Sequence, residues 1–593
     1  MLDTLRKCAV LVGPGMRTRW VVVLLLALTV SALEALGGLV IYALLTRITT
    51  AASGFELPVL GDLHDIAPGL SETQLLLVIG AGIALFFVTR AVVIVVQAYV
   101  QHRVAENAGA RLATRLVEGY LAMPYTVYVQ RNSAELIRNA YDNVQRFVRE
   151  GLVPAVKLVS HLTIILGLLL VLLGTSAMAT LFAVAFLGPL AVLMLRVVQP
   201  RVKRLGSIAQ DTARTSIKSV NEGLGGWRDI RVLGRSAYFV DQFAQARNRL
   251  ARARYLKSTA REVPRIVLET ALILFVLAFL GVSILVQGGA LEALPTLGLF
   301  GYAAVRIQPS INEVLFALNS LKFVGPGVDA VYDDLASFAD TERQEPPTGP
   351  VRPLTRRLEL SDVAFRYPDT DTDALSGIDL DINAGESIGI VGPTGGGKST
   401  LIDIILGLLE PTSGMVTVDG VDLRECVSEW HRSVGLVPQM IFLADDTLRR
   451  NIALGLPDEQ IDERRLREAV AMAQLEAFVA ALPEGLETQV GERGVRVSGG
   501  QRQRLAIARA LYWRPTVLIF DEGTSALDND TEAALLDALE HLRGQRTIIT
   551  VAHRLTTVEK ADRVVLVHDG RIVDVGPYPE LAARHASLRG SVG

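Results

Sequence analysis

The hydrophobic pattern of the chain changes near residue 340. Up to about residue 325, long apolar runs alternate with basic polar stretches. From about residue 355, short apolar runs alternate with helical periods and glycine-rich turns, as is typical of an α/β domain. The intervening segment 338–357 is rich in proline and charge and lacks an apolar period, so we expect a linker. The pattern predicts one domain over 1–337 and a second over 358–593.

Six apolar runs in the first half are each long enough to cross a bilayer, which takes about 20 helical residues. They are 20–45, 75–100, 151–173, 177–198, 266–287 and 296–323. The first run is too long for the apolar core of a signal peptide, and no clean cleavage site of small residues follows it. The first half is therefore predicted to be an α-helical transmembrane domain with six spans and cytoplasmic extensions.

Loop charge predicts how these spans are oriented. The loop 47–74 has one basic residue and the loop 288–295 has none. In contrast, 103–150 carries seven arginines, and 200–262 carries fourteen lysines and arginines. Because basic loops stay on the cytoplasmic side, we expect these two stretches, both termini and the second domain to be cytoplasmic.

Composition excludes several classes of protein. Lysine plus arginine is 59 and aspartate plus glutamate is 62, so the formal charge is −3 and a nucleic-acid partner is not expected. A hydrophobic fraction of 50% with only 20% charged residues excludes a disordered chain and suggests that part of it lies in lipid. The two cysteines, Cys8 and Cys426, are far apart, so we expect free thiols rather than a disulfide scaffold or a zinc site.

A glycine-rich segment of the second domain predicts a phosphate site. Residues 387–391 have the pattern of a buried strand and run into GPTGGGKST at 392–400, which an apolar helical stretch follows. The glycines allow backbone N–H groups to surround phosphate oxygens, and the helix N-terminus adds its dipole. Lys398 is predicted to contact the β- and γ-phosphates, and Ser399 to offer its hydroxyl to Mg²⁺.

Two further segments carry candidate chemistry. The buried-strand pattern 516–520 ends in Asp521 and Glu522. An aspartate there can hold Mg²⁺ and the next glutamate can polarise an attacking water, although a pair of surface acids is the alternative. The segment 497–501 opens a helical pattern in which Ser498 suits an N-cap and the glycines permit an anion to approach. Spacing alone leaves open whether both helix N-termini serve one nucleotide.

Together these motifs resemble those of exporter-type ABC half-transporters, and the resemblance covers essentially the whole chain: six spans and then one α/β P-loop nucleotide-binding domain. It implies that Tyr367 stacks on adenine. It further implies catalytic roles for Glu522, Gln439 and His553, and metal contacts from Ser399, Gln439 and Asp521. The implied nucleotide-binding residues are Tyr367, then Gly392, Thr394, Gly395, Gly397, Lys398, Ser399 and Thr400 of the Walker A loop, then Ser498, Gly499, Gly500 and Gln501 of the signature, and Asp528 of the D-loop.

The resemblance also implies how the chain assembles. In this family the signature of one subunit closes on ATP held by the Walker A loop of the other, so a homodimer with two hydrolysing sites is expected. Two short cytoplasmic helices of the membrane domain dock on the nucleotide domain in this family, and we expect them near 131–143 and 222–231. Trp430 and His431 fit no part of the family pattern and are interpreted as structural.

Charged residues inside the apolar runs indicate a second candidate site, apart from the nucleotide motifs. Arg90, Arg265 and Arg306 lie within or beside predicted spans, where arginine is costly and suggests function. At 1.5 Å per residue, Arg306 would lie about 15 Å below the outer end of its run. Such arginines suit a phosphate or pyrophosphate head group. The alternative is structural pairing, of Arg265 with Glu269 and of Arg90 with Glu34.

The segments 262–269 and 306–310 resemble those of bacterial lipid-linked oligosaccharide flippases of N-linked glycosylation, which carry arginines at matching places. The predicted function is therefore ATP-driven export or flipping of a polyprenyl-pyrophosphate oligosaccharide across the bacterial plasma membrane. A lipid or multidrug exporter is the nearest rival. A membrane-anchored ATPase with a signalling or assembly role is the rival from another class, although six spans argue against a mere anchor.

Overall fold

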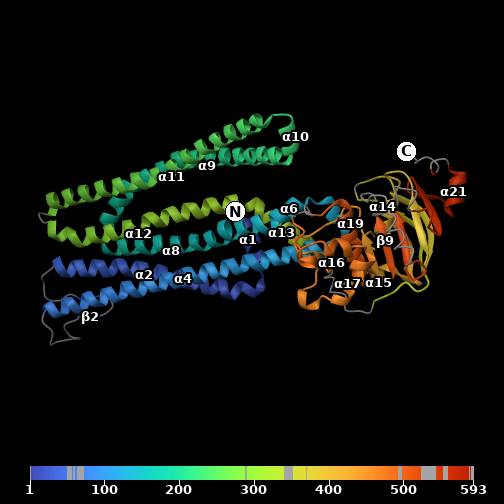
Figure 1. Cartoon of the computed structure of the whole chain (residues 1–593). Coiled ribbons are helices and arrows are strands. Elements are labelled where there is room, and N and C mark those ends of the chain that lie inside the picture. Colours follow the sequence, from blue (N-terminus) through green and yellow to red (C-terminus); the bar gives the residue numbers. More distant parts are fainter. Residues whose placement is uncertain are drawn as a thin grey trace. The chain divides into compact units, whose positions relative to one another are not determined.

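The computed structural model forms two compact units (Figure 1). The first comprises Met1–Gly119 and Ser133–Ala339, and the second comprises Tyr120–Asn132 and Asp340–Gly593. The structure describes residues 2–593 except 50–55, 58–60, 63–71, 288–289, 339–350, 369, 492–496, 522–542, 552–557, 586–587 and 589–593.

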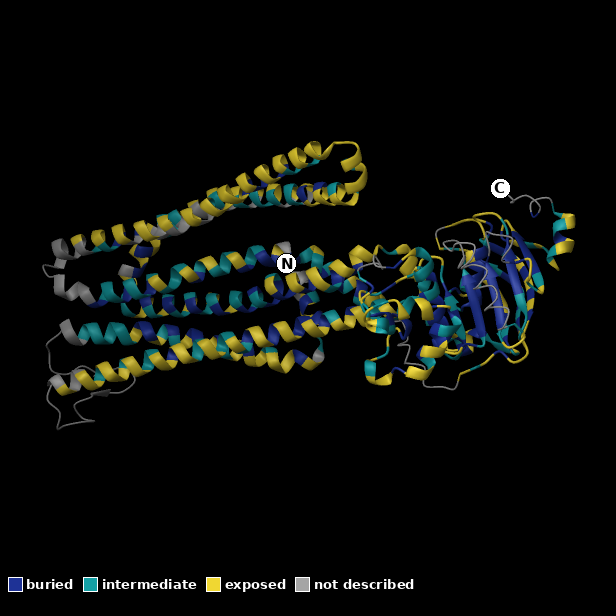
Figure 2. Ribbon diagram, in the orientation of Figure 1, coloured by how far each residue is buried: buried dark blue, intermediate teal, exposed yellow. Residues whose placement is uncertain are grey.

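Long helices build the first unit. They are α2 (Arg17–Thr49), α4 (Glu72–Ala122), α8 (Val153–Thr175), α9 (Ala177–Gly225), α11 (Ser236–Gln287) and α12 (Ala290–Phe323). Five of the six predicted runs lie inside one of these helices, and the run 151–173 begins two residues before α8. Much of α4 is exposed (Figure 2), and its apolar residues Leu85 and Val95 are both 68% exposed, as expected of a helix that faces lipid.

Three stretches among the described residues are long and apolar enough to cross a membrane: Arg17–Thr46, Leu77–Ala122 and Ser133–Thr175. The bent pair Pro295–Lys322 and Gly325–Ser337 would make a fourth span. The described parts of α9 and α11 contain only shorter apolar helices, Thr180–Leu190 and Glu269–Phe279.

Short elements connect and extend these helices. They are α1 (Leu2–Val12), η1 (Pro14–Met16), the strands β1 (Glu56–Leu57) and β2 (Gly61–Asp62), α5 (Tyr125–Gln130), α6 (Ser133–Arg138), η2 (Asn139–Asn143), α7 (Val144–Arg146), η3 (Phe147–Leu152), α10 (Trp227–Val232) and α13 (Gly325–Ser337). The helix α10 lies at the tip of the α9–α11 hairpin, close to the predicted 222–231 (Figure 1). The other docking helix is α5 rather than 131–143, because α5 belongs to the second unit and its Tyr125 packs on that unit's core.

Two sheets form the second unit. The strands are β3 (Arg357–Phe365), β4 (Leu375–Asn383), β5 (Ser387–Val391), β6 (Ser413–Val418), β7 (Val421–Asp422), β8 (Val434–Val437), β9 (Val517–Asp521), β10 (Thr547–Val551), β11 (Arg563–His568) and β12 (Arg571–Gly576). The larger sheet has the order β12-β11-β5-β10-β9-β8 and is parallel except for β12 at its edge. The smaller sheet, β4-β3-β6-β7, is antiparallel.

Helices cover the larger sheet on both faces. They are α14 (Lys398–Ile405), α15 (Leu423–His431), α16 (Leu448–Ile452), α17 (Glu463–Met472), α18 (Glu476–Ala480), α19 (Gly499–Tyr512) and α21 (Tyr578–Arg584), with the short turns η4 (Asp458–Gln460) and η5 (Gly485–Glu487). Alternate side chains of β9 enter different cores: Ile519 packs in the core that contains α14, and Phe520 packs in the core that contains α19. Because successive side chains of a strand point to opposite faces, α14 and α19 lie on opposite faces of the sheet.

Two predictions about single residues are confirmed. Cys8 and Cys426 are buried free thiols. Trp430 is fully buried and its indole nitrogen donates a 2.8 Å hydrogen bond to the carbonyl oxygen of Ile405 at the end of α14. These contacts support a structural role for Trp430, since the last carbonyls of a helix need partners from outside it.

Candidate functional site

The glycine loop and Asp521 lie at the carboxyl ends of the central parallel strands of the larger sheet. Strands β5, β10 and β9 are parallel neighbours, and Val551 at the end of β10 is in register with Ile390 on one side and Asp521 on the other. The carboxyl ends of these strands therefore meet at the same edge, where open α/β sheets bind their ligands. The loop 392–397 follows β5 directly, so the sheet places it beside Asp521.

Glycine is required where the loop turns. Gly392 and Gly397 have φ angles of +153° and +100°. A Cβ atom at Gly392 would lie 2.0 Å from the carbonyl oxygen of Val567, and one at Gly397 would lie 3.0 Å from that of Ala374. Because side chains are excluded, the loop backbone can curl around a phosphate.

The side chains that begin α14 gather over this loop. The ammonium of Lys398 donates hydrogen bonds of 2.8 and 2.9 Å to the carbonyl oxygens of Gly392 and Pro393. The hydroxyls of Tyr367 and Thr400 are 3.2 Å apart, and the Tyr367 ring packs edge-on against Phe365. The structure thus brings the predicted adenine-stacking tyrosine beside the predicted phosphate loop. This arrangement fits a nucleoside triphosphate held along the first turn of α14.

A carboxylate that sequence reasoning missed lies beside the predicted metal ligands. Asp403 is one helical turn after Ser399, and burial together with the negative charge of Asp521 raises the pKa of Asp403 to about 6. A hydroxyl and two carboxylates form an oxygen-rich environment that suits Mg²⁺, which would neutralise charge on the bound phosphates. The sequence contained one indication of this role: Asp403 follows Ser399 by four residues, a spacing that places both side chains on one face of a helix.

Ser498 is the N-cap of α19, as predicted. Its hydroxyl accepts a 3.2 Å hydrogen bond from the backbone N–H of Gln501, and the Gln501 side chain accepts one of 2.8 Å from the backbone N–H of Ser498. This capping box orders the signature segment at the start of the helix. Since α19 and α14 cover opposite sheet faces, the signature and the glycine loop of one chain start from different sides of the domain.

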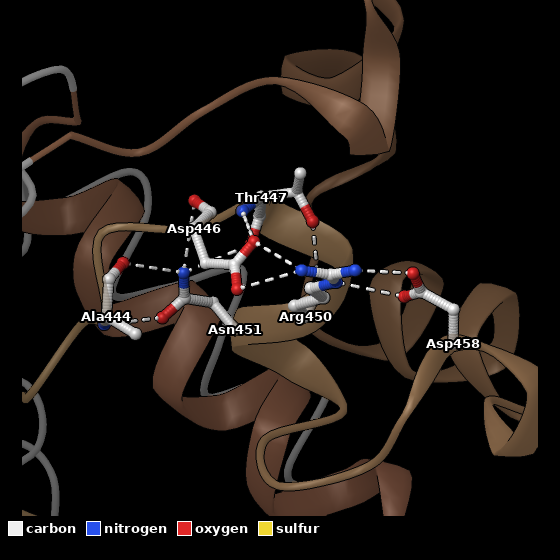
Figure 3. A network of polar contacts seen from close by, with 6 residues as sticks. All are labelled: Ala444, Asp446, Thr447, Arg450, Asn451 and Asp458. Atoms are coloured by element: carbon white, nitrogen blue, oxygen red, sulfur yellow. Dashed lines mark hydrogen bonds and ion pairs between the residues drawn. The ribbon is translucent and has the colours of Figure 1, made fainter. Parts of the chain in front are cut away.

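A network of polar contacts, buried at Asn451 and exposed at the Arg450–Asp458 pair, orders the chain that follows Gln439 (Figure 3). The fully buried Asn451 exchanges hydrogen bonds with the backbone of Ala444, while Arg450 forms an ion pair with Asp458. Arg509 of α19 donates a 2.8 Å hydrogen bond to the carbonyl oxygen of Asn451. The signature helix is thereby tied to the segment that leads from the predicted Q-loop. Gln439 itself is exposed.

Three predicted residues of the nucleotide site, Glu522, Asp528 and His553, lie outside the described residues. Their roles remain predictions. The last described residue before Glu522 is Asp521, at the sheet edge beside the loop.

The first unit contains a second candidate site, made of charged side chains. A single carboxylate, that of Glu34 in α2, contacts two arginines: Arg90 of α4 donates a hydrogen bond to Oε1, and Nε of Arg306 of α12 lies 3.2 Å from Oε2. The hydroxyl of Tyr302 donates to the Glu34 backbone carbonyl at 3.2 Å. The predicted alternative for Arg90, pairing with Glu34, is confirmed. The side chain of Arg265 lies outside the described residues.

Small residues bring α2 and α12 close enough for this contact. A Cβ atom at Gly37 would lie 2.5 Å from the hydroxyl oxygen of Tyr302, and one at Gly38 would lie 3.4 Å from Leu299. Small residues at helix interfaces allow close approach of helices in membranes. One turn after Tyr302, Arg306 reaches the carboxylate of Glu34.

Known families match both units. Residues 24–304 match the family described as ABC transporter transmembrane region, and residues 375–525 match the family described as ABC transporter. Residues 564–586 also match a fragment described as an imidazolonepropionase-like composite domain of bacteria, which spans only β11, β12 and α21.

Curated relatives extend over most of the chain. An ATP-dependent lipid A-core flippase of Thiobacillus denitrificans is 34% identical over 510 residues, which cover 84% of this chain and 85% of that protein. A protein of the same name from Chromohalobacter salexigens is 33% identical over 84% of this chain and 85% of its own length. One from Yersinia pestis bv. Antiqua is 29% identical over 93% of this chain and 94% of its own length.

A solved structure has the same fold. It is described as a bacterial Atm1-family ABC exporter with ATP bound, and it superimposes with a TM-score of 0.72 over 98% of this chain and 99% of that chain. Its sequence identity is 21%, so the similarity is one of fold.

Proposed function

Because the chain belongs to the ABC transporter family as an exporter-type half-transporter that couples ATP hydrolysis to transport, we propose that it moves an anionic lipid outward across the bacterial plasma membrane. The termini and the nucleotide domain lie on the cytoplasmic side in this proposal. The cargo that we propose first is a polyprenyl-pyrophosphate oligosaccharide.

The proposed transporter is a homodimer with two shared ATP sites. Within one chain the glycine loop and Ser498 belong to opposite faces of the sheet, so a second copy supplies the signature that closes on the nucleotide. The helix α10 supports this assembly, since its apolar residues Trp227 and Val232 are exposed and suit docking on a second copy. In each site Lys398 contacts the phosphates, Ser399, Gln439 and Asp521 hold Mg²⁺, Glu522 orients the attacking water and His553 contacts the γ-phosphate.

The observation that carries the anionic cargo is the Glu34–Arg90–Arg306 cluster. Two arginines and one carboxylate leave one net positive charge among the membrane helices. Charges at this depth are costly, and an excess cation there suits a phosphate or pyrophosphate group. The relatives' name favours a second candidate cargo, a lipid A-core, over a drug.

The test is lipid stimulation of ATP hydrolysis by the purified protein in nanodiscs. We expect stimulation by polyprenyl-pyrophosphate sugars that exceeds stimulation by lipid A-core, and no stimulation by phosphatidylcholine or apolar drugs. Stronger stimulation by lipid A-core would transfer the assignment to the second candidate. Stimulation by drugs without any response to anionic lipids would contradict the proposal.

A further inference from the structure

Glu34 holds its two arginines unequally. The Arg90 guanidinium donates a hydrogen bond to Oε1, and both side chains are only 6% exposed. Arg306 is 39% exposed, and its Nε lies 3.2 Å from Oε2 without donating a hydrogen bond. The carboxylate is therefore held by hydrogen bonds from Arg90 and, at 3.3 Å, from the hydroxyl of Tyr302, whereas its contact with Arg306 is an ion pair without a hydrogen bond.

The cluster also has unused capacity for an anion. Among the residues that the structure describes, the buried Nε groups of Arg90 and Arg306 donate no hydrogen bond. The guanidinium carbon of Arg306 lies 5.9 Å from the centre of the Tyr302 ring, which holds the cation beside the carboxylate. The partial exposure of the Arg306 side chain and the one excess positive charge of the cluster both favour an additional anionic group at Arg306.

We propose that Glu34 is a resident counter-ion, which the anionic head group of the cargo displaces from Arg306 and which returns to Arg306 when the cargo leaves. The inference deepens the proposed function and rests on it. Arg90 is a positioning residue here, because its hydrogen bond keeps Glu34 within the cluster during the exchange. A buried charge without a partner is strongly unfavourable, and the exchange leaves Arg306 paired both before and after binding.

A second ion pair, which shares helix α12 with the cluster, offers a matched control. Lys157 of α8 lies 3.2 Å from Glu313 of α12, seven residues beyond Arg306 and about 10 Å along the helix axis. Both side chains are half-buried, but this pair has one cation for one carboxylate and so no excess charge. Loss of Glu313 would therefore remove an ion pair without freeing Arg306.

The experiment compares wild-type protein with Glu34→Gln in nanodiscs, with dioleoyl phosphatidic acid as the anionic probe and dioleoylglycerol as the uncharged one. We expect phosphatidic acid to bind Glu34→Gln about tenfold more tightly, which is about 1.4 kcal/mol. Half-maximal stimulation of ATP hydrolysis then needs less lipid, while the maximal stimulated rate falls because nothing displaces the bound anion. Glu313→Gln should leave the affinity within about twofold of wild type, and dioleoylglycerol should not distinguish the variants.

Glu34→Gln leaves Arg90 buried without its carboxylate, so this variant is at risk of misfolding. The double variant Glu34→Gln/Arg90→Gln removes both charges of the buried pair and should show the same tighter binding. Unchanged or weaker binding of phosphatidic acid by a folded Glu34 variant would overturn the counter-ion role while leaving the proposed function intact. Failure of the wild-type protein to respond to any anionic lipid would overturn both.

Discussion

The nucleotide domain and the membrane helices each hold cations for an anion, and they do so in different ways. Lys398 donates to two neutral carbonyl oxygens of the glycine loop. Arg90 and Arg306 instead share the carboxylate of Glu34. These two hydrogen bonds fix the ammonium of Lys398 against the loop that would hold the phosphates, whereas the carboxylate of Glu34 competes directly with an incoming anion for the arginines. The comparison suggests that one site is built to hold its anion firmly and the other to exchange it.

The first way to test this comparison is Lys398→Ala, which has the largest expected effect. Loss of the cation beside the phosphates should lower the ATPase kcat/KM by roughly 10²–10³-fold. Steady-state hydrolysis by the purified protein measures the effect, and thermal unfolding checks that the variant is folded. Hydrolysis within threefold of wild type by a folded variant would show that the loop does not depend on this cation.

Arg90→Ala tests the other half of the comparison. Without Arg90, the carboxylate of Glu34 pairs with Arg306 alone and competes more strongly with an incoming anion. We therefore expect phosphatidic acid to bind about tenfold more weakly, which is a loss of about 1.4 kcal/mol in binding free energy. Arg103→Ala is the matched control, because Arg103 is an exposed arginine of the same helix. Equal losses in the two variants would mean that helix α4, rather than the cluster, determines the result.

Tyr302→Phe should have a smaller effect. It removes the hydroxyl that is shared between the backbone carbonyl and the carboxylate of Glu34, and it keeps the ring beside Arg306. Loss of one such hydrogen bond typically costs about 1 kcal/mol, so the midpoint of thermal unfolding should fall by only a few degrees. A Tyr302→Leu variant, which also loses the ring, should fall further. Identical midpoints for the two variants would exclude a role for the ring.

Asp403→Asn tests the electrostatics of the nucleotide domain and has the smallest expected effect. The pKa of Asp403 is raised to about 6, so the folded state binds a proton more tightly than the unfolded state, whose carboxyl has its usual lower pKa. The resulting destabilisation is fully present above about pH 6 and is relieved as the pH falls towards 4. Unfolding midpoints of the full-length protein between pH 4 and 8 should therefore depend less on pH in Asp403→Asn than in wild type. Parallel pH profiles would contradict the assignment.

The nucleotide site could be predicted from the sequence to a greater extent than the membrane cluster. The loop, its strand and its helix are consecutive in the chain, so the spacing around Lys398 already determines the local arrangement. Glu34, Arg90 and Arg306 come from three helices, and their contact depends on how closely α2 and α12 pack at Gly37. Pairing of Arg90 with Glu34 could be offered only as an alternative, and the shared contact with Arg306 was not predicted.

The docking helix at 125–130 illustrates a different limit. Residues 131–143 were expected there, but Pro124 precedes a short helix that begins at Tyr125. The choice depended on tertiary packing, because Tyr125 contributes to the core of the nucleotide domain. A six-residue helix has too few positions for hydrophobic periodicity to identify it.

The most direct test of ATP-driven anionic lipid transport uses proteoliposomes in which the nucleotide domains face outward. A polyprenyl-pyrophosphate sugar in the outer leaflet is followed by its accessibility to an added pyrophosphatase. ATP should make this lipid inaccessible within minutes in wild-type vesicles, and should leave it accessible in vesicles that contain Glu522→Gln. Active ATP hydrolysis without any ATP-dependent movement of the pyrophosphate lipid or of lipid A-core would contradict the account.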